Sequence, residues 1–323
     1  MTISQGGLIQ AVDYNTLRTG VSNLLGVGSG DRGYGQTVAA DTDVVAGTTV
    51  VSATPTTLKQ WVALYADMKK IADHQQTDIT TLKNAYDNNI KSGSLIQYSD
   101  INLIATTLAT LDANRLNIGT ASPVQYSDDP LISSQRTQTV GGPWGAPSKT
   151  TVQHTFKITF TSSEAVRFFF NAGGKITFTA SRLGGTVTTQ NTEWTNLLSS
   201  MGTITVGQAS TTAGSGSPQV GFKDITTNTL VYYKGGYVNK ATSDPGWTTY
   251  SNNDYNITAT RDGANLTFNV YFNDDGKSKD PNQYGTYDVV DGTLTSDIRI
   301  LRPSGSNVSL PSPTVINLAE LSA

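Results

Sequence analysis

The sequence predicts an α+β protein of more than one domain, with helical repeats and short strands in its N-terminal third and an antiparallel β-sandwich in its C-terminal half. The chain has 323 residues, which is more than a single hydrophobic core usually holds. A motif that leads into a helix occurs twice before residue 120, and short alternating segments follow residue 150. We therefore expect domains at residues 1–120 and 151–323, joined by a linker at 121–150.

Composition excludes several classes of protein. Charged residues make up only 15% of the chain, the net charge is −3, and no cysteine is present. Disulfides and thiolate metal sites are therefore excluded, and the lack of a basic run argues against nucleic-acid binding. No apolar stretch is long enough for membrane insertion, and the first residues do not resemble a signal peptide, so we expect synthesis in a cytoplasm. Because few residues are charged, we expect a surface of uncharged polar residues, which is typical of extracellular or virion proteins.

A nine-residue motif occurs at 7–15 and again at 94–102, with Leu-Ile-Gln, then Asp, then Asn in identical spacing. In each copy a short extended piece precedes a helix, capped by Asp13 in the first copy and by Ser99 or Asp100 in the second. Both helices place apolar residues at three- and four-residue steps. These stripes are Tyr14, Leu17, Val21 and Leu24, up to Gly26, and Ile101, Ile104, Leu108 and Leu111.

A third unit of weaker similarity lies between the two copies. Residues 49–53 are expected to be extended, and Thr54 and Pro55 suit the N-cap and first turn of a helix. Its apolar stripe consists of Leu58, Trp61, Val62, Tyr65, Met68 and Ile71. Three such small units cannot form secure separate cores, so we expect obligate homo-oligomerisation. The expected interface is Tyr14, Leu17, Val21, Leu24, Leu58, Trp61, Tyr65 and Met68.

Two glycine-rich segments are expected to be connections. Residues 26–36 lack the Gly-Lys-Ser/Thr ending of a phosphate-binding loop and follow a helix, so we predict a flexible or assembly-ordered connector. Residues 119–149 show no sustained helical or strand period, which indicates a domain boundary. Trp144, within this stretch, is expected to dock on a neighbouring domain.

The C-terminal half is expected to be organised around a β-hairpin at residues 164–182. An apolar run at 166–170 precedes two adjacent glycines that can form a turn. Three consecutive phenylalanines cannot share one face of a strand, so Phe168 and Phe170 should lie on one face and Phe169 on the other. The returning strand places Ile176, Phe178 and Ala180 on one face.

Further short strands favour a sandwich over a parallel sheet. In the first of them, Phe156 and Ile158 are expected to face inward. A short helix is expected at 194–201 and a terminal docking arm at 315–321. The expected strands lie at 151–160, 203–206, 219–222, 229–233 and 294–301, with a hairpin at 255–272 around Asp262-Gly263.

Residues with catalytic or metal-binding chemistry are few. The two histidines are His74, at a helix end, and His154, at a strand position expected to face outward, and neither belongs to a triad or metal motif. Residues 273–280 lack the alternating acids of a calcium loop. We therefore expect no enzyme, no cofactor and no metal. Glycan cleavage would need two facing carboxylates, and the glutamates are Glu164, Glu193 and Glu320, with an Asp as a possible partner.

A group of aromatic residues expected at the surface lies in a region rich in Gly, Ser and Thr. The group is Tyr232, Tyr233, Tyr237, Trp247 and Tyr250. Aromatic rings beside Asn and Thr can stack on sugars, which suggests binding of a glycan or host surface. Packing against the sandwich or a neighbouring chain is the commoner use of such residues.

Four segments together resemble virion structural proteins of tailed phages, with appendage proteins of contractile-tailed cyanophages as the nearest match. They are the repeated Leu-Ile-Gln-x-x-Asp-x-Asn motif, residues 33–36 (Gly-Tyr-Gly-Gln), residues 71–75 (Ile-Ala-Asp-His-Gln) and residues 167–174 (Arg-Phe-Phe-Phe-Asn-Ala-Gly-Gly). The resemblance implies a virion protein, made in the host cytoplasm, whose N-terminal segment anchors to neck, tail or baseplate proteins. It also implies a projecting β-rich fibre, commonly trimeric, for host attachment. The alternative is a carbohydrate-binding or glycan-cleaving protein like a tailspike.

Overall fold

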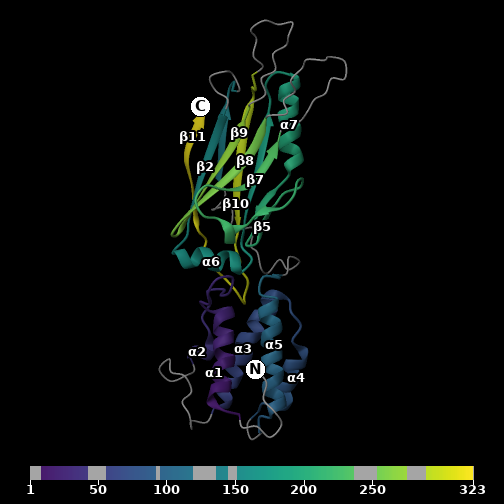
Figure 1. Cartoon of the computed structure of the whole chain (residues 1–323), viewed down its shortest axis with the longest axis vertical. Helices are drawn as coiled ribbons and strands as arrows, with labels where there is room; N and C mark the ends of the chain where they lie inside the picture. The colour runs from purple at the N-terminus through teal and green to yellow at the C-terminus, as the bar shows by residue number, and fades with distance from the viewer. Residues whose placement is uncertain are drawn as a thin grey trace. The chain divides into compact units, whose positions relative to one another are not determined.

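The computed structural model shows helices and two antiparallel sheets, which confirms the α+β class (Figure 1). The chain divides into two compact units. The helical unit comprises Met1–Ser127, Arg167–Gly173 and Arg302–Leu310, and the β unit comprises Asp128–Val166, Gly174–Leu301 and Pro311–Ala323. The structure describes residues 9–42, 56–91, 95–118, 136–144, 151–235, 253–274 and 289–322.

Helices α1, α3 and α5 pack against one another in the helical unit. The short helix α2 packs on α1 and α3, and α4 packs on α5. The five helices are α1 (Ala11–Leu25), α2 (Ala39–Thr42), α3 (Leu58–Gln75), α4 (Thr80–Asn88) and α5 (Tyr98–Ala113).

The repeated motif is a helix start. In α1 the N-cap is Gln10, and its backbone N–H donates to Oδ2 of Asp13 at 2.7 Å. In α5 the N-cap is Gln97, and its N–H donates to Oδ2 of Asp100 at 2.9 Å. The carboxylate therefore satisfies a backbone donor that a helix leaves without an intrahelical partner, and it also complements the positive end of the helix dipole.

This geometry corrects the expected caps. Asp13 and Asp100 stand at the third helical position rather than at the N-cap. The helix of the middle unit begins after Thr57, whose N–H donates to Oε1 of Gln60 at 2.7 Å, and not at Thr54-Pro55. Residues 43–55, including the expected strand at 49–53, lie outside the described residues. At the start of α3, the amide oxygen of Gln60 therefore has the role that the carboxylates of Asp13 and Asp100 have in α1 and α5.

The three main helices share one apolar register. Counted from the N-cap, positions 4, 7, 11 and 14 are apolar in each helix, and all are buried except Leu108. They are Tyr14, Leu17, Val21 and Leu24; Trp61, Leu64, Met68 and Ile71; and Ile101, Ile104, Leu108 and Leu111. A Cβ on Gly20 would lie 2.6 Å from Cδ2 of Leu108, so a glycine lets Leu108 pack closely against α1.

The expected oligomer interface is mostly interior. Tyr14, Leu17, Val21, Leu24, Trp61 and Met68 are at most 2% exposed within a single chain. The rings of Tyr14 and Trp61 meet edge to face at 5.0 Å, and Tyr65 stacks on Tyr86 at 4.4 Å. Leu58 is the most exposed of the eight residues, at 39%. The argument that these stripes need copies of the chain is therefore wrong, because three helices of one chain bury them together; homo-oligomerisation itself stays a prediction.

The β unit contains a six-stranded sheet in the order β1-β10-β3-β4-β5-β6 and a five-stranded sheet in the order β11-β2-β9-β8-β7. Helix α7 (Thr189–Met201) packs on β3, with a 3₁₀ turn at Phe222–Asp224 later in the chain. The strands are β1 (Arg136–Gly141), β2 (Thr151–Thr159), β3 (Lys175–Leu183), β4 (Ile204–Val206), β5 (Ser210–Thr212), β6 (Gln219–Val220), β7 (Thr229–Gly235), β8 (Asp254–Asp262), β9 (Asn265–Asn273), β10 (Thr293–Leu301) and β11 (Thr314–Ser322).

Side chains of the two sheets share a core. The ring of Phe178 on β3 lies 6.4 Å from that of Phe156 on β2 and 5.1 Å from that of Phe268 on β9. The β8–β9 hairpin was correctly predicted, and its turn uses Gly263 at φ +54°. Alternate residues of both strands are buried, as the sequence period requires.

The first half of the expected central hairpin is a helix. Residues Ser163–Asn171 form α6, and the Ala165 N–H donates to Oγ of Ser162 at 3.0 Å, as at a helix N-cap. Phe169 and Phe170 are both 1% exposed, whereas strand geometry would have put them on opposite faces. A short apolar run cannot by itself distinguish a strand from a helix, and the Ser-Ser-Glu start was the overlooked signal. Only the second strand of the hairpin, β3, was correctly predicted.

Three smaller differences concern chain ends and connections. Residues 136–141 of the expected linker form β1, which pairs with β10. Trp144 bridges to Val290 and meets Trp194 edge to face at 4.9 Å, so it packs inside the β unit rather than on a neighbouring domain. The terminal arm is a full strand, β11, paired with β2.

The helix-start motif makes a direct prediction. Asp13→Ala should lower the free energy of unfolding by about 1 kcal/mol, because it removes both the N-cap hydrogen bond and a favourable charge at the helix N-terminus. Urea denaturation followed by helical circular dichroism would measure this loss. The control is Asp87→Ala, which removes an exposed carboxylate paired with Lys83 on α4 and should cost less. Equal losses in the two variants would contradict the capping role.

Candidate functional site

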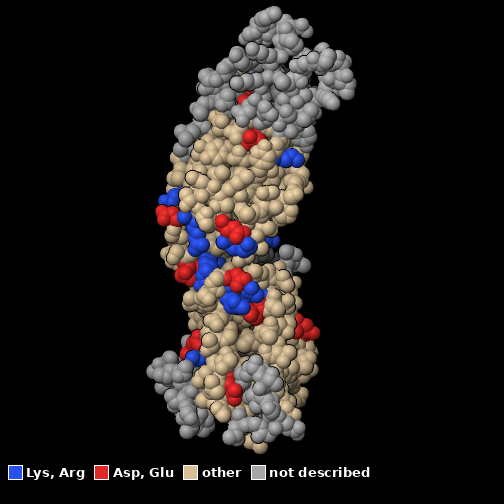
Figure 2. Space-filling model, in the orientation of Figure 1, with Lys and Arg blue, Asp and Glu red and all other residues tan. Residues whose placement is uncertain are grey.

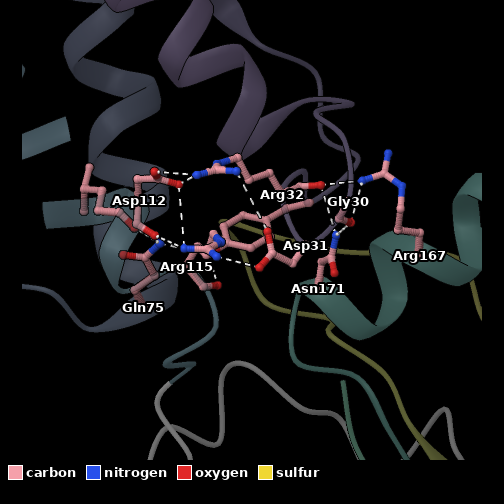
Figure 3. A network of polar contacts seen from close by, with 10 residues as sticks. Gly30, Asp31, Arg32, Gln75, Asp112, Arg115, Arg167 and Asn171 are labelled. Atoms are coloured by element: carbon pink, nitrogen blue, oxygen red, sulfur yellow. Dashed lines mark hydrogen bonds and ion pairs between the residues drawn. The ribbon is translucent and has the colours of Figure 1, made fainter. Parts of the chain in front are cut away.

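Three of the segments singled out in the sequence meet in the helical unit. They are the glycine-dense loop at 26–36, the end of α3 at 71–75 and residues 167–173 of α6 and its turn. Figure 3 shows their polar side chains converging, together with the end of α5. We call this cluster the interlock. It is the largest concentration of polar contacts between distant chain segments in the described part of the helical unit.

The loop folds back on the end of α1. The N–H groups of Tyr34 and Gln36 donate to the carbonyls of Leu24 and Leu25 at 3.0 and 2.9 Å. Gly33 adopts φ +92°, and a Cβ there would lie 2.0 Å from the carbonyl oxygen of Val27, so only glycine fits. The loop is thus ordered by its own chain, rather than the flexible or assembly-ordered connector expected from its composition.

Two side chains of α6 bind the carbonyl oxygens of this loop. The Arg167 guanidinium donates to the carbonyls of Val27, at 2.7 Å, and of Arg32. Nδ2 of Asn171 donates to the carbonyls of Gly30 and Arg32 at 3.1 and 3.0 Å. Positions 167 and 171 are four residues apart and therefore share one face of the helix. The planar guanidinium, with five donors, suits a loop that turns several carbonyls toward one point.

Ion pairs join the same loop to the end of α5. Arg32 binds Asp112 through two parallel hydrogen bonds of 2.8 and 2.9 Å, and Arg115 binds Asp31 at 2.5 Å. The hydrogen bond from Arg115 holds the pKa of Asp31 below its usual value, and the bond from Arg32 does the same for Asp112. Both carboxylates therefore stay ionised and paired at neutral pH.

A buried layer of rings and amides lies beside the ion pairs. The Tyr34 hydroxyl donates to the carbonyl of Arg115 at 2.6 Å and accepts from Nε2 of Gln75 at 2.8 Å. His74 meets the ring of Tyr34 edge to face at 5.0 Å, and its Nε2 lies 3.0 Å from the carbonyl of Ala172. Since a carbonyl only accepts, Nε2 carries the proton. Burial lowers the pKa of His74 to about 4, which keeps the imidazole neutral.

The interlock uses its polar groups to bind one another. Its guanidinium groups bind carboxylates and carbonyls, and its one histidine is 3% exposed and neutral. Among the described residues, no group of three or more His, Cys, Asp or Glu residues could hold a metal ion. Such an arrangement can fix three distant segments in place.

The second histidine does not face outward as expected. His154 is fully buried in the β unit, and its Nδ1 lies 2.8 Å from Oγ of Ser296. Every second residue of β2 points inward: Val152, His154, Phe156 and Ile158. Strand alternation therefore places His154 in the core. Burial lowers the pKa of His154 to about 4. The outward prediction is wrong because the position of a residue along a strand, and not its polarity, decides which face it occupies.

The surface aromatics are only partly where they were expected. Tyr233 is 53% exposed, but Tyr232 is 2% exposed and lies 6.1 Å from the ring of Tyr255. A register shift between Leu230 and Tyr232 interrupts the alternation of β7, so the adjacent Val231 and Tyr232 are both buried. Tyr237, Trp247 and Tyr250 lie outside the described residues.

Comparison of the chain with protein-family models, with curated proteins and with solved structures gives no match. None of the helices in the described residues has the length and apolar character needed to cross a membrane.

The carbonyl contacts of Arg167 predict an effect of a conservative substitution. Arg167→Lys keeps the charge but cannot span separate carbonyls, so the free energy of unfolding should fall by about 2 kcal/mol. Urea denaturation followed by helical circular dichroism would measure it. Arg299→Lys, at a side chain 58% exposed, is the matched control and should change stability by less than about 0.5 kcal/mol. Equal effects at the two positions would show that the carbonyl contacts do not stabilise the fold.

The two buried histidines predict acid destabilisation. In the unfolded chain they titrate near 6.5, whereas in the folded chain their pKa is about 4. Between these values the unfolded state binds more protons, so stability falls as the pH decreases from about 6.5 to about 4. The expected slope is about 1.4 kcal/mol per pH unit for each histidine in the middle of this window.

Urea denaturation at a series of pH values would measure this slope in the wild type and in His74→Gln and His154→Gln. Each variant should lose its own share of the slope, because glutamine supplies an amide that does not titrate in this range. A variant with the wild-type slope would show that its histidine has the same pKa in the folded and the unfolded chain, which contradicts the lowered pKa.

Proposed function

We propose that this chain is a non-enzymatic structural component of a tailed-phage virion, a fibre or appendage of the neck, tail or baseplate. The observation that carries the proposal is the interlock. Three segments that carry the resemblance to virion appendage proteins, residues 33–36, 71–75 and 167–174, take part in it. Tyr34 contacts His74 and Gln75, and His74 contacts the carbonyl of Ala172. Arg167 and Asn171 bind carbonyls of the loop that leads into residues 33–36. Groups used in this way serve assembly of the chain rather than turnover of a substrate.

Under this proposal the two units have separate tasks. The helical unit anchors the chain to neck, tail or baseplate proteins, and the β unit, with its two sheets packed as a β-sandwich, projects for host attachment. In this proposal the partner covers apolar side chains that are exposed near the starts of α1 and α3, where Val12 is 60% exposed and Val62 is 49% exposed. We also propose homo-oligomers, with a trimer preferred, in a virion assembled after synthesis in the host cytoplasm.

A second candidate is a carbohydrate-binding or glycan-cleaving protein like a tailspike. The exposed ring of Tyr233 on β7 favours binding, since an exposed tyrosine offers a flat surface and a hydroxyl to a sugar. Cleavage would require two carboxylates across a cleft. Release of reducing sugar from host lipopolysaccharide by the purified protein would establish cleavage and end the structural-only proposal.

Purified particles test the main proposal. Immunogold labelling with an antibody against this chain, together with cryo-EM of particles from infected cells, should place regular copies at the neck, tail or baseplate. Particles made without the chain should lack that appendage, while labelling of a capsid protein serves as the control. The proposal would be overturned if the chain were abundant in infected cells but absent from purified particles.

A further inference from the structure

Strand register places two tyrosines and two amides in one row across the five-stranded sheet. Gln153 on β2 pairs with Tyr271 on β9, Tyr271 with Asn256 on β8, and Asn256 with Tyr233 on β7. Their neighbours along β8 and β9 are buried in the core, so the row lies on the outward face. Adjacent strands are about 4.8 Å apart, which places the two tyrosines roughly 10 Å apart with an amide between them.

The amides around this row are held in fixed orientations. Oδ1 of Asp254 accepts from Nδ2 of Asn256 at 2.7 Å and from Nδ2 of Asn273 at 2.8 Å. On the other side of the row, Nε2 of Gln153 donates to Oδ1 of Asn269 at 3.1 Å. Side chains that are already ordered lose little conformational entropy when a ligand binds. The face is therefore prearranged for hydrogen bonding.

The face carries little charge. The outward positions of β2, β8 and β9 are mainly Thr, Asn and Gln with Tyr271, and the charged side chains among them are Lys157, Asp254 and Asp262. Figure 2 shows a broad area with few charged side chains over the strands that Figure 1 labels β8 and β9. The exposed apolar side chains of this sheet, Leu230, Ile316 and Leu318, lie on its edge strands β7 and β11, so the middle of the face lacks the apolar centre of a stable protein interface. With so few charges, the face does not attract a polyanion.

We infer that this outward face binds a neutral oligosaccharide, with Tyr233 and Tyr271 stacking on sugar rings and Asn256 and Gln153 binding hydroxyl groups between and beside them. Sugar hydroxyls both donate and accept hydrogen bonds, as amides do, and the apolar faces of pyranose rings match tyrosine rings. The inference deepens the proposed attachment role, on which it rests, by naming the ligand class and the residues that bind it.

Affinity electrophoresis of the full-length protein would test the inference, with dextran, mannan and galactan as neutral probes and alginate as the acidic comparison. At least one neutral probe should retard the wild type. Tyr233→Ala, Tyr271→Ala and Asn256→Ala should each weaken that binding at least tenfold, without a change in the thermal unfolding midpoint. Tyr233→Phe keeps the ring and should retain most of the binding. Tyr98→Ala, at a partly exposed tyrosine of the helical unit, should bind like the wild type.

Three results would overturn the inference: no neutral probe retards the wild type, alginate alone does so, or the row variants bind as tightly as the wild type. If sedimentation shows that the wild type self-associates and Tyr233→Ala disperses it without any glycan binding, the occupant is a second copy and the inference also fails. Because this test needs only purified protein, its failure is distinguishable from absence of the chain from virions.

Discussion

The binding of main-chain carbonyls by Arg167 and Asn171 is the interaction on which the helical unit depends most. A loop that turns the carbonyls of Val27, Gly30 and Arg32 toward one point would leave strong acceptors without partners unless donors were brought to them. The donors come from residues about 140 positions later in the chain. The helical unit is therefore complete only when the segment 167–173 is present, so a fragment ending at residue 120 would lack part of its own structure.

A shared pattern of caps and apolar positions explains how three small helices form a core without copies of the chain. Helices α1, α3 and α5 begin with a side chain that accepts a hydrogen bond from the N-cap N–H, and their apolar positions follow the cap in one register. Equal register brings equivalent apolar layers together when the helices pack side by side. Aromatic residues in the first layer, Tyr14 and Trp61, fill the space that smaller side chains would leave. Any oligomer must therefore use other surfaces.

The few charged residues and the many uncharged polar residues lie in different parts of the structure. Charged groups of the interlock pair with one another, as Arg32 does with Asp112. On the outward face of the five-stranded sheet, amide side chains form hydrogen bonds between strands. Amide and hydroxyl ladders satisfy one another across strands without the long-range field that charges create. The molecule thus keeps polar surfaces suited to close, neutral contacts.

The sequence by itself determined what depends on neighbours along the chain. The helical periods of α1 and α5, the stop of α1 at Gly26 and the β8–β9 hairpin with its glycine turn were all predictable, because cap, period and turn chemistry lie within a few residues. The motif segments of the interlock were also visible, although their mutual contacts were not.

Only the tertiary structure decided the rest. The apolar run at 166–170 by itself suits a strand or a helix, and the Ser-Ser-Glu start is the local sign that it forms α6. No local pattern shows that Arg167 and Asn171 bind a loop about 140 residues earlier in the chain. A register shift in β7 buries Tyr232, which no local pattern marks. These contacts and this register depend on residues outside the local sequence, and a short-range preference of a fraction of a kcal/mol per residue yields to long-range packing and hydrogen bonding.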